Sequence, residues 1–159
     1  MTFQRIQAPP GVEILREHSE LTKVWRDGDT VFKQQPKYLS DNEYAFLYAM
    51  RDSGYVPGNL RSWDIETISM DYIEPQKVTD PESFLDHYSK VLMALSVRGI
   101  RHGDLTTFAI IVNDNRPYLI DFAESRWYWD RAPAKRPVSD SKLLLESMYV
   151  LCGVFPTYE

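Results

Sequence analysis

The chain has 159 residues, of which 43% are hydrophobic and 26% are charged, a composition ordinary for one globular domain or two small lobes. Its net charge of -5 argues against a general nucleic-acid surface, so we expect no DNA binding. A single cysteine and the lack of an apolar run of about 18 residues favour a cytoplasmic protein without a membrane span.

The first part of the chain is predicted to be rich in strands. Apolar and polar residues alternate over residues 11–36, and "RDGD" at 26–29 is typical of a tight hairpin turn. An apolar stripe in residues 38–54 predicts a helix that ends at a glycine. Residues 59–75 then read as two short strands closed by a proline.

The second part is predicted to place helices on either side of a hairpin. Asp80 and Pro81 begin the first helix, and Gly99 ends it. Residues 99–125 read as a strand, a turn and a strand, with the turn at "NDNRP". A last, largely apolar helix is predicted over residues 138–155.

This order of elements predicts an α+β fold with two lobes. A small β-rich N-lobe with one helix is expected over residues 1–73, and a mostly helical C-lobe over residues 74–159. We expect the two lobes to form one domain. Their join lies near "DYIEPQKVTD", where two prolines interrupt the periodicity.

Four residues offer the parts that phosphoryl transfer from ATP requires, namely a lysine for the phosphates and carboxylates for Mg²⁺ and for the attacking hydroxyl. Lys33 ends the strand "TVFK", and Glu43 in the next helix can pair with it. Asp104 and Asp121 flank the hairpin, which returns both acids to one rim. Each residue alone has an ordinary structural explanation, so the argument rests on their joint order.

The segments around these acids match a known family. "HGDLTT" (102–107) and "LIDFAES" (119–125) resemble the H-R-D and D-F-G segments of the protein-kinase-like superfamily. The sequence is most similar to minimal atypical kinases of the Bud32 type, with RIO kinases and aminoglycoside phosphotransferases as further relatives. The resemblance covers roughly residues 11–155. It implies a two-lobed kinase-like fold with a truncated C-lobe, and ATP and Mg²⁺ as cofactors.

The resemblance also implies roles for single residues. Asp104 would be the catalytic aspartate, and Asp121 would be the magnesium ligand. Lys33 would take part in catalysis by binding the α- and β-phosphates, and Glu43 would hold that lysine from the helix.

Other residues of the resemblance frame the nucleotide and support the catalytic loop. "SMDYIEP" is similar to the hinge, so Met70 would border the adenine and the backbone of Asp71 and Ile73 would meet its edge. His102 is expected to be a polar core residue that supports the loop through hydrogen bonds. Asp140 resembles the buried aspartate that anchors the loop from below.

The sequence departs from the family pattern at four places. No glycine-rich motif precedes Lys33, Gly103 replaces the arginine of H-R-D, and Ala123 replaces the glycine of D-F-G. Ala109 stands where the family has an asparagine that binds the second metal, and its side chain has no oxygen. Loss of a metal ligand can lower the rate ~100-fold or more. Ala109 is either the mark of a naturally weak or inactive kinase or a change in a competent one.

We therefore predict a minimal atypical kinase that transfers the γ-phosphate of ATP to a Ser/Thr hydroxyl of a protein, or hydrolyses ATP. The alternatives are a non-catalytic pseudokinase that binds nucleotide or a partner protein, and a small-molecule phosphotransferase. Trp127 and Trp129 are interpreted as packing residues or as a surface for a partner. "RAPAKRP" (131–137) is a solvated loop or a basic segment that steers an acidic or phosphorylated partner.

Overall fold

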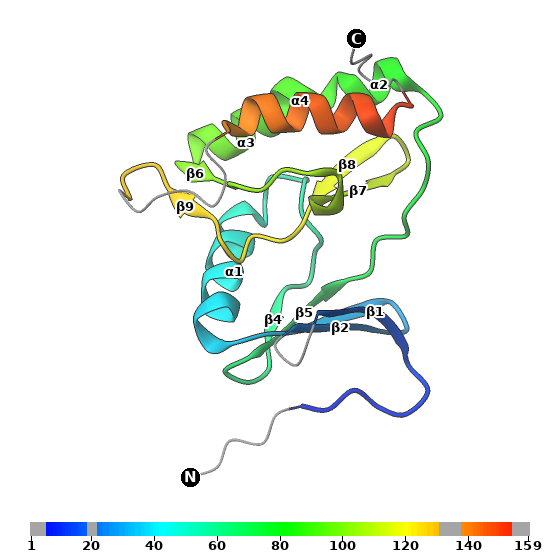
Figure 1. The fold of residues 1–159 in the computed structure, drawn as a ribbon, viewed down its shortest axis with the longest axis vertical. Helices are drawn as coiled ribbons and strands as arrows, with labels where there is room; N and C mark the ends of the chain where they lie inside the picture. Colours follow the sequence, from blue (N-terminus) through cyan, green and yellow to red (C-terminus); the bar gives the residue numbers. More distant parts are fainter. Residues whose placement is uncertain (1–5, 19–21, 131–137, 154–159) are drawn as a thin grey trace.

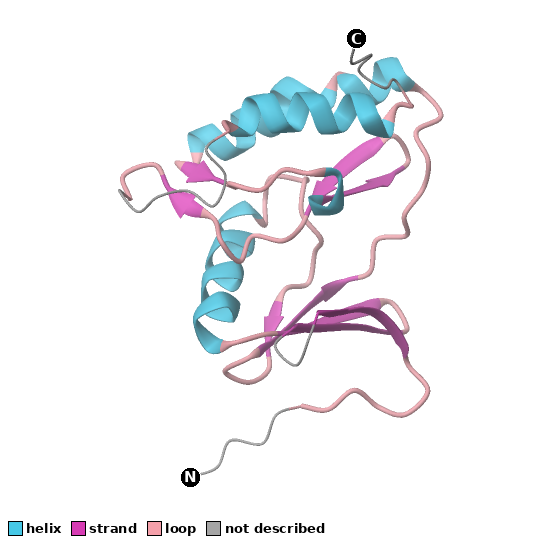
Figure 2. Ribbon diagram, in the orientation of Figure 1, coloured by secondary structure: helices cyan, strands magenta, loops and turns pink. Residues whose placement is uncertain are grey.

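The computed structural model describes residues 6–18, 22–130 and 138–153. The basic segment 131–137, with its suggested role in steering a partner, lies outside the described residues. Within the described ranges the chain forms a strand-rich lobe and a helix-rich lobe (Figure 1, Figure 2). This arrangement confirms the predicted α+β, two-lobed fold.

The N-lobe is built on an antiparallel sheet, which forms the lower layer in Figure 1. Its described strands, in the order in which they lie side by side, are β1 (Glu13–His18), β2 (Thr22–Asp27), β3 (Thr30–Gln34), β5 (Thr67–Asp71) and β4 (Arg61–Ser62). The predicted turn joins β2 and β3, and Gly28 there has a φ of 61° that glycine adopts without strain.

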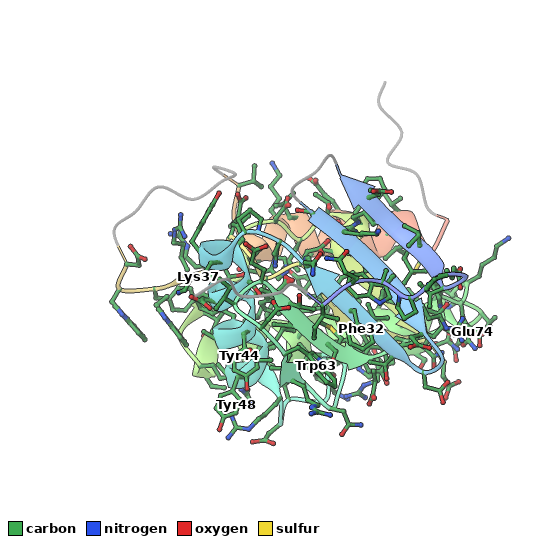
Figure 3. The ribbon with its side chains drawn as sticks, turned by 90° about the horizontal axis from the view of Figure 1, so that it is seen from below. Phe32, Lys37, Tyr44, Tyr48, Trp63 and Glu74 are labelled. Carbon is green, nitrogen blue, oxygen red and sulfur yellow. The ribbon has the colours of Figure 1, made fainter. Side chains whose placement is uncertain are left out.

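Helix α1 (Lys37–Met50) stands between this sheet and the helices of the C-lobe (Figure 1). Its inward face buries Phe46, Leu47 and Met50. Tyr44 and Tyr48 lie one turn apart on this helix and stack at 6.1 Å (Figure 3). Tyr44 is partly buried against the core, whereas Tyr48 is 48% exposed. The helix is therefore amphipathic in the way that its apolar stripe predicts, but only part of the stripe is buried.

The C-lobe helices form the upper layer of Figure 1. They are α2 (Pro81–Leu85), α3 (His87–Val97) and α4 (Asp140–Leu151). Asp80 caps α2 as predicted, because its carboxylate accepts the Ser83 amide at 3.1 Å. The prediction of one helix up to Gly99 is wrong in one respect, because a tight turn at Asp86 divides α2 from α3.

The predicted hairpin consists of β7 (Ile110–Asn113) and β8 (Arg116–Leu119), preceded by a short 3₁₀ turn, η1 (Thr107–Ala109). Asp114 and Asn115 between the strands both have left-handed backbones, with φ of 50° and 56°, as a tight two-residue hairpin turn requires. Two short strands, β6 (Ile100–Arg101) before this unit in the chain and β9 (Arg126–Trp127) after it, pair with each other. In Figure 1 the hairpin lies directly beneath the C-lobe helices.

Two backbone contacts and a shared core join the parts of the molecule. The amide of Leu119 donates to the Tyr55 carbonyl at 2.7 Å, and the amide of Gln76 donates to Val112 at 2.7 Å. The core runs without interruption from α1 and β5 to α4, and its fully buried members include Met50, Phe84, Ile100, Leu119 and Leu144. The predicted lobe boundary after residue 73 falls between β5 and α2 and stays a prediction. Among the described residues, no helix has the length and apolar character needed to span a bilayer.

Candidate active site

Lys33 of β3 is held between two carboxylates from different parts of the chain. Its Nζ lies 2.6 Å from Oε1 of Glu43 on α1 and 3.0 Å from Oδ1 of Asp121, which follows β8. The Lys33 and Glu43 side chains are 9% and 1% exposed. Gln35 donates a further hydrogen bond to Glu43 at 3.3 Å. The structure therefore brings together three of the residues predicted for phosphate and metal binding.

The charges of this cluster shift the pKa values of its members. Burial alone would lower the pKa of Lys33, but the carboxylates of Glu43 and Asp121 outweigh it and raise the pKa above the ordinary value. Burial would likewise raise the pKa of Asp121, but Lys33 and Arg16 hold it below the ordinary value. Lysine and aspartate are therefore both charged at neutral pH.

Arg16 of β1 is a member of the cluster that sequence reasoning missed. Its Nη1 donates to both carboxylate oxygens of Asp121, at 3.2 and 3.3 Å. Arg16 lies opposite Val24, which in turn lies opposite Lys33, so the three residues follow one line across the sheet. The register shifts between Ile14 and Arg16, and alternation counted from the sequence does not show such a bulge.

Asp121 itself has an unusual backbone, with a φ of 61°. This left-handed conformation is uncommon for a residue with a side chain. It persists where the surrounding structure holds it in place, and such residues cluster at active sites. The conformation directs the carboxylate to Lys33 and Arg16 instead of continuing the direction of β8.

An apolar cavity of about 330 Å³ opens beside the cluster. Met70, Asp71 and Ile73 of the predicted hinge line it. Its other walls come from the N-lobe sheet, α1 and the hairpin, and include Leu15, Val24, Val31, Leu47, Ile111 and Ile120. A small enclosure with apolar walls and few polar groups has the character of a site for a flat heteroaromatic ring.

A second cavity of about 460 Å³ adjoins the first and is lined by Asp104, Thr106 and Thr22. Arg16, Lys33, Phe108 and Asp121 line both cavities, so the two spaces form one cleft. Asp104 thus faces the same space as the lysine cluster, from the opposite lobe. Phe108 at their junction is 80% exposed.

The loop that carries Asp104 is fixed by hydrogen bonds to Asp140 and His102. The Asp140 carboxylate accepts the amides of His102 and Gly103, at 2.7 and 2.9 Å. His102 is 1% exposed, and its Nδ1 accepts the Asp104 amide at 3.1 Å while its Nε2 donates to the Ile120 carbonyl at 2.7 Å. These two bonds require the neutral imidazole, and burial lowers the pKa of His102 in agreement.

Two serines and an asparagine that sequence reasoning missed complete the support of this region. Ser147 donates to the Leu105 carbonyl at 2.7 Å, and Ser125 donates to the His102 carbonyl at 2.9 Å. Asn42 of α1 donates to the carbonyls of Ala123 and Ser125. Single hydroxyl and amide residues carry no sequence signal of this kind, because their partners are backbone atoms distant in the chain.

Ala109 is buried in η1, at 1% exposure. Its carbonyl accepts the Ile120 amide at 2.9 Å, so the backbone is held beside the segment that leads to Asp121. The side chains of Asn113 and Asn115 in the hairpin do not replace the oxygen that an asparagine at position 109 would supply. The Asn113 side chain donates to the Glu74 carbonyl, and the Asn115 side chain binds residues 79 and 80. The described residues contain no cluster of three or more His, Cys, Asp or Glu that could hold a metal ion.

Neither Trp127 nor Trp129 is among the residues that line the two cavities. Trp127 packs against Phe46 at 4.6 Å, and Trp129 stacks on Trp127 at 5.1 Å with nearly parallel rings. Trp127 is therefore a packing residue, which is one of its two predicted roles. Trp129 is 71% exposed, so its role as a partner surface stays a prediction.

Comparisons with known proteins identify the family and the fold of the chain. A family model described as the RIO domain matches residues 15–127, which is more than half of the chain. The Rio2 kinase of Chaetomium thermophilum, solved as an ADP/Mg²⁺-phosphoaspartate complex, superimposes with a TM-score of 0.63 at 15% identity. WbdD, solved with the kinase inhibitor LY294002, superimposes with a TM-score of 0.56 at 16% identity.

These two structures are longer than the chain. The Rio2 match covers 92% of this chain and 58% of that protein, and the WbdD match covers 88% and 45%. The chain thus spans about half the length of the solved structures it resembles. At such low identity the likeness establishes the fold, while the family follows from the RIO domain match.

Proposed function

Because the chain belongs to the RIO domain family of atypical kinases, we propose that it binds ATP between its lobes and transfers the γ-phosphate to a hydroxyl group. The observation that carries this proposal is the position of Lys33, 2.6 Å from Glu43 and 3.0 Å from Asp121 at the junction of two adjoining cavities. A buried lysine held in this way is prepared to receive phosphate oxygens.

The adenine ring fits the apolar cavity beside Met70. The amide of Asp71 is already bonded to the Gly58 carbonyl at 2.9 Å, and that of Tyr72 to the Asp29 carbonyl at 2.7 Å. The carbonyl of Asp71 and the amide of Ile73 are therefore the groups that we expect to meet the adenine edge. The phosphates would then extend toward Lys33 and Asp121, which line both cavities.

The oxygens near the phosphates fit one Mg²⁺ ion but not two. Mg²⁺ binds through one or two carboxylates together with substrate phosphates and water, and Asp121 and Asp104 line the phosphate cavity. Ala109 supplies no oxygen for a second ion. When bound, the ion would neutralise charge on the phosphates. Asp121 is the ligand that we propose, and it must exchange some of its contact with Arg16 or Lys33 for the metal.

Asp104 is the residue that we propose to orient the acceptor hydroxyl and to accept its proton. Its loop is fixed through His102 and Asp140, so its carboxylate can be positioned in advance of the substrate. We propose a Ser/Thr hydroxyl of a protein as the acceptor, with water or a small molecule as the alternatives. The protein partner, like a cytoplasmic location, stays a proposal.

The test of this function is nucleotide binding followed by phosphate transfer. Isothermal titration with MgATP should show binding that Lys33→Met weakens at least tenfold, because the substitution removes the ammonium and keeps the apolar stem. Lys37→Met is the matched control, since Lys37 is 63% exposed and pairs with Asp41 one helix turn away. Equal binding by the wild type and Lys33→Met would contradict the proposal.

A second candidate function is a pseudokinase that binds nucleotide without turnover. The observation that favours it is the burial of Ala109, together with the engagement of Asn113 and Asn115 elsewhere. The two functions are separated by following the γ-phosphate after binding has been shown. If nucleotide binds but neither phosphate release nor transfer to protein is detected, the result assigns the scaffold function.

A further inference from the structure

We propose that Arg16 is a built-in cation of the nucleotide site, which binds phosphate oxygens and competes with Mg²⁺ for Asp121. This inference rests on the proposed nucleotide-binding function and adds a residue that the kinase resemblance does not assign. Its consequence is that nucleotide binds in the absence of Mg²⁺, and that loss of Arg16 makes binding depend on the metal.

The first argument is position. Arg16 comes from β1, lines both cavities and contacts both oxygens of Asp121, at 3.2 and 3.3 Å. Its side chain is 37% exposed, so the guanidinium borders the open cleft and is not enclosed in the core. A ligand that reaches Lys33 must therefore pass close to Arg16.

The second argument is charge balance. In the cleft, Lys33 and Arg16 offset the two carboxylates of Glu43 and Asp121. Glu43 is buried and already holds Lys33, whereas Asp121 is shared between the two cations. A triphosphate adds several negative charges to this balanced group. Arg16 is the more exposed of the two cations, so it can turn toward phosphate at the smaller cost.

The third argument is the chemistry of the guanidinium. It carries five N–H donors in a planar fork, and the contact with Asp121 uses Nη1 alone. Such a fork matches the spacing of phosphate oxygens and remains charged at every pH of interest. Arg16 can therefore contact Asp121 and a phosphate at once.

The fourth argument is the loss of the second metal ligand. Ala109 leaves the site with fewer oxygens for cations, and the described part of the chain has Asp121 as the one acidic residue that lines both cavities. An ion at Asp121 has to displace Arg16 from at least one carboxylate oxygen. The Arg16 guanidinium thus supplies part of the positive charge that a second metal ion would supply, and it lowers the apparent affinity of the site for the first ion.

The experiment is titration of ATP into the full chain in EDTA and in Mg²⁺, followed by calorimetry. The wild type should bind ATP in EDTA, with a Kd within about tenfold of the value in Mg²⁺. Arg16→Gln should weaken binding in EDTA by about tenfold or more, the effect of one charge-assisted contact, and should weaken it less in Mg²⁺. Arg16→Lys keeps the charge but not the planar fork of donors, so its affinity for ATP in EDTA should fall between those of the wild type and Arg16→Gln.

Arg61→Gln is the matched control, because Arg61 lies on β4 of the same sheet and stacks over Trp63 outside the cleft. This variant should bind as the wild type does in both buffers. Thermal unfolding of each variant establishes that it is folded before it is titrated.

Two results would overturn the inference while leaving nucleotide binding intact. The first is wild-type binding that requires Mg²⁺ and is insensitive to Arg16. The second is tighter binding by Arg16→Gln in both buffers, which would mark Arg16 as a plug that blocks the site. Absence of ATP binding under every condition would instead overturn the proposed function, and this inference with it.

Discussion

Lys33 and Glu43 form an ion pair of 2.6 Å that links the N-lobe sheet to α1, and both side chains are almost completely buried. Breaking such a pair leaves a charge without its partner in a medium of low dielectric. Asp121 still faces Lys33 at 3.0 Å, so part of the compensation survives. We therefore expect Glu43→Gln to lower the free energy of unfolding by about 1–3 kcal/mol in urea denaturation.

The double variant Lys33→Met/Glu43→Leu separates stability from function. Replacement of a buried pair by apolar side chains is often neutral, so the double variant should regain stability relative to Glu43→Gln. It should not regain ATP binding, because the ammonium is gone. A double variant that is less stable than Glu43→Gln would show that the pair stabilises the fold beyond charge compensation.

Asp121 and Asp104 should respond differently to loss of charge. Asp121→Asn removes the proposed metal ligand, so Mg²⁺ should no longer strengthen ATP binding in calorimetry. Asp104→Asn should keep a measurable effect of Mg²⁺ on ATP affinity, because Asp104 is proposed to act on the acceptor hydroxyl. Equal loss of the Mg²⁺ effect in both variants would contradict the division of roles.

The fold was predictable where the sequence pattern is local. Alternation and the "RDGD" turn predict β2 and β3, and a cap at Asp80 followed by a proline predicts the start of α2. The cleft was predictable for Lys33, Asp104 and Asp121 because "HGDLTT" and "IDFAES" carry a family resemblance. These segments lie far apart in the chain, and the resemblance supplied the tertiary relation that periodicity does not contain.

The rest was not predictable because it depends on register and on backbone partners. Arg16 enters the cleft only because a bulge after Ile14 shifts the alternation of β1 by one residue. The break at Asp86 leaves no proline or glycine as a signal. Ser125 and Ser147 bond to backbone carbonyls, and residue type alone does not indicate such a partner.

Asp140 should stabilise the loop more than it stabilises its own helix. Asp140→Ala removes the acceptor for the amides of His102 and Gly103, and hydrogen bonds to a charged group contribute about 1.5–3 kcal/mol. We expect a loss of about 2 kcal/mol in the free energy of unfolding, with faster amide exchange at both residues. Hydrogen exchange measured by NMR tests the second effect.

Ser139→Ala is the control for this prediction, since Ser139 caps α4 through the Lys142 amide at 3.3 Å. Loss of this cap should cost about 1 kcal/mol without a change in exchange at His102 and Gly103. Faster exchange at these two amides in both variants would indicate that the start of α4, and not the Asp140 carboxylate, holds the loop.

His87 should make stability depend on pH. Burial lowers the pKa of His87, with contributions from Arg116 and Lys90, and Nδ1 lies 2.8 Å from the Tyr55 hydroxyl. The unfolded chain therefore binds more protons than the folded chain once the pH falls below the ordinary histidine pKa of about 6.5. The contribution of neutral His87 to the free energy of unfolding is complete above that pH, and it is lost as the pH falls toward the lower pKa of the folded state.

Thermal unfolding at several pH values between about 7.5 and 5 measures this dependence, the window in which an unfolded histidine gains its proton. The Tm of the wild type should fall with pH, and His87→Gln should show a shallower fall because it keeps a polar partner for Tyr55 and cannot be protonated. His102 contributes with the same sign, so a residual slope is expected in the variant. An unchanged slope would mean that His87 is not protonated on unfolding.

Ala109→Asn tests whether the chain is an enzyme that lacks one metal ligand. The substitution lies beside the segment that leads to Asp121, because the Ala109 carbonyl accepts the Ile120 amide there. The site is 1% exposed, so the larger side chain should cost about 1–3 kcal/mol of stability. If the kinase function holds, phosphate transfer or release should rise ~100-fold or more, as expected for regaining a ligand in an electrostatically stabilised transition state.

Ala109→Val is the control, because valine is also larger than alanine but has no side-chain oxygen. It should destabilise the chain without raising turnover. Folded Ala109→Asn protein that binds MgATP and shows no turnover would instead favour the pseudokinase, since the missing oxygen would then not be what limits the reaction.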